Sequence, residues 1–143
     1  MTYETIQETV GQVLGTIEAV LGGIAAISLL VAGVGIINTM TISVMERTRE
    51  IGILKAVGSK SRDIMLIFIS EAVLTGFIGG ILGGLFGFLL SRVVGDYINL
   101  PVTNSVELLI GITFFAIMTA VISGLYPAWR AASLHPVEAL RYE

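Results

Sequence analysis

Apolar residues near the N-terminus recur with alternating spacings of three and four. They are Tyr3, Ile6, Val10, Val13, Ile17 and Val20, and the register continues through Ile24, Ile27, Val31, Val34 and Asn38. A repeat of 3.5 residues keeps one seam toward a partner helix, so the pattern predicts one helix that runs from a polar part into an apolar part. Two interpretations of residues 1–19 stay open. They form either an amphipathic surface helix or a stalk helix that projects from a membrane and pairs with another helix.

The chain contains three long apolar stretches, and the first of them overlaps the end of this repeat. Ala19–Met45 carries no charge over 27 residues, and the other two cover roughly Ile64–Ser91 and Leu108–Leu125, with a polar connection at Arg92–Glu107. About 20 apolar residues cross the hydrocarbon core of a bilayer. Only 13% of the residues are charged, against about a quarter in soluble domains. We therefore expect an all-α integral membrane protein with three transmembrane helices.

Glycines recur on one face of the second apolar stretch. They form overlapping pairs four residues apart: Gly76, Gly79, Gly80, Gly83, Gly84 and Gly87. Such a face lets two backbones approach closely, and close packing drives helix association in lipid. The pattern predicts that this helix packs against another helix, but it does not identify the partner.

Residues 46–63, between the first two stretches, hold eight of the nineteen charged residues. Ile51, Leu54 and Val57 lie at helical spacing among them, which predicts a short amphipathic helix of about two turns along the membrane surface. Gly58 is expected to end it, since glycine ends helices readily. Ser59 or Ser61 is expected to cap the next helix, with Asp63 in its first turn.

Two polar residues fall inside the apolar stretches. Asn38 either joins two helices by a hydrogen bond or lies near the membrane interface. Glu71 is a candidate functional residue, because a carboxylate within a membrane span is costly. The alternative is that the membrane core begins only after Glu71, since Ala72–Ser91 is long enough to cross by itself.

Lysine and arginine residues are distributed asymmetrically. Residues 46–63 carry five and the C-terminal end carries two, Arg130 and Arg141, whereas the N-terminal part carries none and the Arg92–Glu107 connection carries one. Because cytoplasmic loops are enriched in these residues, we expect the loop and the C-terminus in the cytoplasm and the N-terminus outside. The expected organisation is an extracytoplasmic stalk helix at 1–19, a transmembrane domain at 20–130 and a cytoplasmic tail at 131–143.

Candidate chemistry is sparse. The chain has no cysteine and one histidine, His135, which excludes thiol chemistry and leaves no histidine metal site. No serine–histidine pair, pair of aspartates or metal-ligand arrangement lies in the spans. Gly58-Ser59-Lys60-Ser61 lacks the glycine spacing of a phosphate-binding loop. The chain is therefore not expected to be an enzyme, to bind a metal or cofactor, or to bind nucleic acid.

Several short motifs together resemble the FtsX-like permease domain, and most closely its MacB-type ABC transporter branch. They are Asn38-Thr39-Met40, the run from Glu46 to Gly52, Lys55-Ala56-Val57-Gly58, Glu71-Ala72 before the glycines, and the terminal run from Pro136 to Arg141. Trp129 and His135 depart from the basic and Asp residues that are common in such tails. The resemblance implies four spans with an external domain after the first, so the chain is expected to be a fragment or to be completed by another polypeptide.

The resemblance also implies partners and a mechanism. Two permease copies, identical or different, would pair with two cytoplasmic ABC ATPase domains that bind ATP and Mg²⁺, in the cell membrane and with its lipid around them. Movement would pass to the outside for export of peptide, antibiotic or lipoprotein-like substrates, with room for an extracytoplasmic adaptor. The alternative is a non-transporting regulator of a cell-wall hydrolase. The expected coupling residues are Glu46, Arg47, Arg49, Glu50, Ile51, Gly52, Leu54, Lys55 and Gly58.

Overall fold

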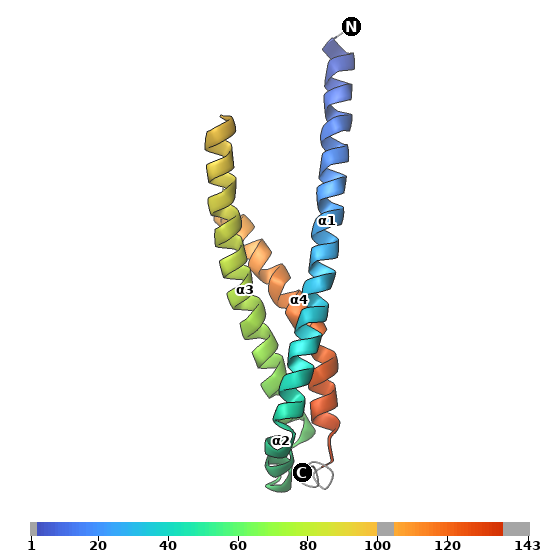
Figure 1. The fold of residues 1–143 in the computed structure, drawn as a ribbon, viewed down its shortest axis with the longest axis vertical. Helices are drawn as coiled ribbons and strands as arrows, with labels where there is room; N and C mark the ends of the chain where they lie inside the picture. Colours follow the sequence, from blue (N-terminus) through green and yellow to red (C-terminus); the bar gives the residue numbers. More distant parts are fainter. Residues whose placement is uncertain (1–2, 100–104, 136–143) are drawn as a thin grey trace. The chain divides into compact units, whose positions relative to one another are not determined.

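The computed structural model describes residues 3–99 and 105–135, which form four helices and no strand. The helices are α1 (Tyr3–Glu46), α2 (Thr48–Ala56), α3 (Ser61–Ile98) and α4 (Val106–Ser133) (Figure 1). Three of them are long and apolar enough to cross a membrane, over Gln7–Glu46, Ser61–Ile98 and Val106–Ser133. The predicted all-helical class with three spans is thus confirmed.

The chain divides into two compact units, at residues 1–34 and 35–143. The described part of the first unit belongs to α1, which is one helix, as the continuous register predicts. Its large apolar side chains from Val10 to Val34 are exposed, apart from the partly buried Leu29. The hydroxyls of Thr9, Thr16 and Ser28 donate to carbonyls four residues earlier, so these hydroxyls need no partner from lipid.

The second unit is built around a small core to which all four helices contribute. Its buried side chains are Met40 and Val44 of α1, Ile51 of α2, Ile64, Phe68 and Ala72 of α3, and Ala128 and Ala131 of α4. Pro127, inside α4, is also fully buried. Because proline has no N–H, one helical hydrogen bond is absent and the helix is weakened locally. The proline ring is packed inside the second unit. This core joins α2 to the C-terminal parts of α1 and α4 and to the N-terminal part of α3, segments that lie near one another in Figure 1.

Helices α3 and α4 pack through three of the six predicted glycines. A Cβ atom placed on Gly76 would lie 2.7 Å from the Ile117 Cα, and one on Gly80 would lie 2.8 Å from the Thr113 Cα. One on Gly84 would collide with the Leu109 side chain. On this face, the helix that closely approaches the glycines is α4.

The other three glycines, Gly79, Gly83 and Gly87, form what we call the second glycine face. A Cβ atom placed on any of them would have nothing within 4 Å. Their predicted packing stays a prediction. On α4, small residues recur at every fourth position, and Ala116 and Ala120 lie against Gly76 while Gly124 lies against Ala72 of α3. The series is Ala116, Ala120, Gly124, Ala128 and Ala132. We call the face formed by Gly76, Gly80 and Gly84 the first glycine face. The spacing of small residues on α4 is the sequence signal that identifies this helix as its partner.

Two helix boundaries differ from the prediction. Helix α3 continues past Arg92 to Ile98 and ends at Asn99, which adopts the left-handed conformation (φ 55°) that asparagine tolerates. At its other end the N-cap residue is Lys60 rather than Ser59 or Ser61, and the Asp63 carboxylate accepts from the Lys60 N–H at 2.9 Å. Asp63 lies in the first turn as predicted. The motif run from Pro136 to Arg141 lies outside the described residues.

Candidate functional site

Helix α2 follows α1 after a single non-helical residue, Arg47. The Thr48 hydroxyl donates to the carbonyls of Val44 and Met45, both at 2.9 Å, which ties the two helices together. At the other end, the Gly58 N–H bonds to the Lys55 carbonyl and the Ser59 N–H to the Leu54 carbonyl. This is a Schellman motif. Gly58 has φ +108°, so it ends α2 as predicted in a conformation that favours glycine.

The inner face of α2 is buried. Ile51 is only 3% exposed and belongs to the core of the second unit, and Gly52 beside it is also buried. The predicted apolar edge grouped Ile51 with Leu54 and Val57 as contacts for a partner. In the structure the Ile51 side chain packs against the chain's own helices, which leaves Leu54 and Val57 as the exposed members of that edge.

Lys55 is held by the end of α4. Its Nζ donates to the carbonyl oxygens of Ala132 and Leu134, each at 2.6 Å. The last carbonyls of a helix lack intrahelical partners and form the negative end of its dipole. The ammonium group is therefore well matched to this position, although sequence reasoning assigned Lys55 to a partner surface.

A second polar contact joins the start of α2 to α3. The Arg47 guanidinium lies 3.5 Å from the Glu71 carboxylate, and both side chains are partly exposed. Pairing is the usual way in which a charge near a membrane span is accommodated. The pair thus gives Glu71 a structural partner in the charged loop. The side chain of Asn38, the other polar residue predicted within a span, is exposed.

The outer face of α2 combines apolar and charged side chains. Ile53, Leu54 and Val57 are 47%, 42% and 84% exposed. Arg49 and Glu50 of α2, and Glu46 at the end of α1, are also exposed. Ile53 is not part of the predicted apolar edge, because it falls outside the spacing of three that joins Ile51, Leu54 and Val57. We call Ile53, Leu54 and Val57 the outer patch.

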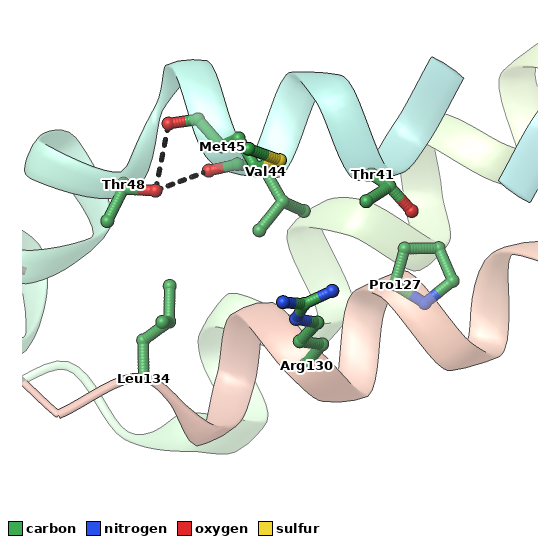
Figure 2. Close-up of a pocket in the computed structure, with 7 residues that line it drawn as sticks. All are labelled: Thr41, Val44, Met45, Thr48, Pro127, Arg130 and Leu134. Atoms are coloured by element: carbon green, nitrogen blue, oxygen red, sulfur yellow. Dashed lines mark hydrogen bonds between the residues drawn. The ribbon is translucent and has the colours of Figure 1, made fainter. Parts of the chain in front are cut away.

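A cavity of about 190 Å³ lies between the end of α1 and α4. It is lined by Thr41, Val44, Met45, Thr48, Pro127, Arg130 and Leu134. Figure 2 shows the Arg130 side chain extending from α4 toward this space, with the Thr48 hydroxyl bonded to α1. The lining offers apolar contact and one cation. Among the described residues, no three histidine or acidic side chains gather as metal ligands would.

The model of the family described as FtsX-like permease C-terminal matches residues 22–136. The chain belongs to this family. Together with the three apolar helices, this makes it a multi-pass membrane protein, and the resemblance noted in the motifs is confirmed.

Curated relatives of this FtsX-like chain are ABC transporter permeases. An uncharacterized permease of Methanocaldococcus jannaschii is 44% identical over the whole chain, which covers 37% of that protein. The macrolide export ATP-binding/permease protein MacB of Bdellovibrio bacteriovorus is 44% identical over 96% of the chain, which covers 21% of it. The pyoverdine export ATP-binding/permease protein PvdT of Pseudomonas putida is 44% identical over 90% of the chain, which covers 19% of it. The chain thus spans about a fifth to two fifths of these relatives.

Proposed function

We propose that this chain is the C-terminal, three-span part of a MacB-type ABC transporter permease. Its relatives carry permease and export names, which favours transport over the regulation of a cell-wall hydrolase. ATP and Mg²⁺ bind to a partner ATPase, and the permease acts as a pair of copies in the cell membrane. The exported molecule belongs to the peptide, antibiotic or lipoprotein-like classes, and an extracytoplasmic adaptor completes the path where one is needed.

The observation that carries this proposal is the division of α2 into two faces. The inner face is fixed by Ile51, Lys55 and Arg47 to the rest of the second unit. The outer patch is exposed beside charged side chains. A loop that only sets membrane orientation needs basic charge, but it needs no firmly held helix and no apolar patch. Protein interfaces commonly combine a buried apolar centre with a charged rim. We therefore assign the outer patch to docking on the ATPase.

Substitution of Leu54 by Asp tests the docking. It places a carboxylate in an apolar contact, which costs on the order of several kcal/mol when the charge is buried without a partner. We expect the full-length Leu54→Asp permease to insert normally but to lose its ATPase on co-purification, or to let it hydrolyse ATP without transport.

The matched control is Ser61→Asp. It adds the same charge to the same loop, at the first turn of α3, where the helix dipole favours a carboxylate. Ser61 is exposed, so this variant should retain its ATPase. Normal ATPase binding and normal coupled activity in Leu54→Asp would leave α2 as an orientation signal only.

The proposed orientation places the N-terminus outside and the C-terminus and α2 in the cytoplasm, on the basis of the seven-to-one distribution of basic residues. Because the chain has no cysteine, single cysteines report cleanly on topology. In intact cells, Glu8→Cys and Asn104→Cys should react with a membrane-impermeant thiol reagent, while Ser59→Cys and Glu143→Cys should be protected. Labelling at Ser59 or protection at Asn104 would overturn this orientation.

A further inference from the structure

Lys55 differs from the other basic residues of the charged loop in where its charge lies. Its two carbonyl partners, in Ala132 and Leu134, come 77 and 79 residues later in the chain. In the described part of the chain, it is the one basic side chain of residues 46–63 with a hydrogen bond to the backbone of a distant helix. Lys55 therefore connects α2 to a helix that is remote in sequence.

The chemistry of this contact makes it strong and directional. No further helical turn follows α4, so its last carbonyls receive no N–H hydrogen bonds from the helix itself. A charged donor forms shorter and stronger hydrogen bonds than a neutral one, and both distances here are 2.6 Å. Because one ammonium group bonds to two carbonyls, it restrains both the position of α2 and its rotation relative to the end of α4.

The connectivity of the chain explains why such a contact is needed. Arg47 alone separates α2 from α1, and residues 57–60 join it to α3. No short segment joins α2 to α4, so only side-chain contacts link them. Ile51 and the α4 residues Ala128 and Ala131 share one core, but apolar contacts allow sliding more readily than hydrogen bonds to a charged group do.

We infer that Lys55 is a positioning residue that makes α2 and the C-terminal end of α4 move as one body. This deepens the proposed function and rests on it for the source of the movement, the ATPase on the outer patch. Lys55 would then carry the movement of α2 directly into the third span, rather than through α1 alone. The loop's other lysine, Lys60, precedes α3 and has no such role.

The test is a distance measurement between spin labels at Ala56 and Ser133, both exposed and outside the outer patch. It is made in the full-length permease without its ATPase and again with ATP and vanadate in the assembled transporter. The wild type should give one narrow distance distribution in both states. Lys55→Met keeps the apolar stem but removes the donors, so its distribution should broaden or shift, most strongly in the trapped state.

Lys60→Met is the matched control, because it removes the same charge from the same loop. It should keep the narrow distribution, and Lys55→Arg should keep it in large part, since donors and charge remain. If Lys55→Met does not assemble, Lys55→Gln retains a neutral donor and should give an intermediate broadening. A narrow distribution in both uncharged Lys55 variants, or equal broadening in Lys60→Met, would overturn the inference.

Co-purification of the ATPase separates this inference from the docking proposal. Lys55→Met should keep its ATPase, because the outer patch is intact, whereas Leu54→Asp should lose its ATPase and keep the narrow label distance. If Leu54→Asp both binds its ATPase and couples ATP hydrolysis to transport normally, the docking proposal fails while the nucleotide-free label distances still test Lys55. If Lys55→Met loses the ATPase although its label distance stays narrow, Lys55 belongs to the docking surface and the positioning role is wrong.

Discussion

The two glycine faces of α3 lie on one helix and have different surroundings. Gly76, Gly80 and Gly84 contact α4 so closely that a Cβ atom would meet backbone or side chain. Gly79, Gly83 and Gly87 have open space around them in the described structure. A run of glycine pairs therefore indicates that another helix can approach closely. It does not show which of the two glycine faces is contacted by a helix of the same chain.

Helix α2 shows the same division with different residues. Ile51 and Lys55 contact the chain itself, while Ile53, Leu54 and Val57 are exposed. In both helices, the predicted functional residues separate into an internal set that supports the fold and an external set available to lipid or to partners. Variants of neighbouring residues in the two sets should therefore have opposite effects on stability and on assembly.

The largest expected effect comes from leucine at the first glycine face. Gly80→Leu places a side chain where even a Cβ atom would lie 2.8 Å from the Thr113 Cα, and the backbone cannot yield cheaply. Overpacking typically costs 1–3 kcal/mol and sometimes more, so we expect a loss of about 3 kcal/mol or more. Thermal unfolding of the purified full-length permease in detergent measures this loss.

Gly83→Leu is the matched control on the second face of the same helix. Nothing lies within 4 Å of its Cβ position, and leucine is favourable in lipid, so the chain should fold normally. The sequence alone predicts disruption by both variants. Equal destabilisation by Gly80→Leu and Gly83→Leu would remove the distinction between the two faces.

The membrane spans and the short helix were predictable because their signals are local. An uncharged stretch such as Ala19–Met45 has few alternatives to a transmembrane helix, and Gly58 after an apolar, helix-spaced run predicts the end of α2. The end of α3 was missed because Arg92 and Asp96 resemble a polar loop, although helices extend beyond the membrane wherever their ends are solvated. The Lys60 N-cap was missed because Asp63 reaches back to its N–H.

The contacts between distant segments could not be predicted from one sequence. Lys55 meets carbonyls almost 80 residues later, and backbone carbonyls leave no mark in the side-chain pattern. The burial of Ile51 likewise depends on which side of α2 faces α4, which helical spacing alone leaves open. The alanine and glycine residues at every fourth position of α4 were the one available signal for its contact with α3.

The smallest expected effect concerns the ion pair between Arg47 and Glu71. Both side chains are substantially exposed, at 50% and 38%, and exposed pairs contribute about 0.2–1 kcal/mol. A double-mutant cycle with Arg47→Ala and Glu71→Ala, followed by thermal unfolding, should give a coupling energy in that range. A coupling well above it would mean that the pair lies in a more apolar environment and is a principal anchor of α2.

Photo-crosslinking from α2 tests the central claim most directly, because it reports which residues touch the ATPase. A diazirine-bearing amino acid close to leucine in size is incorporated singly at Ile51, Leu54 or Val57 of the full-length permease, in cells that also produce its ATPase. Leu54 and Val57, on the outer patch, should cross-link to the ATPase, and Ile51, at 3% exposure, should cross-link only within the permease. Cross-links from Ile51 to the ATPase, or none from both Leu54 and Val57, would contradict the division of α2 into a supporting face and a docking face.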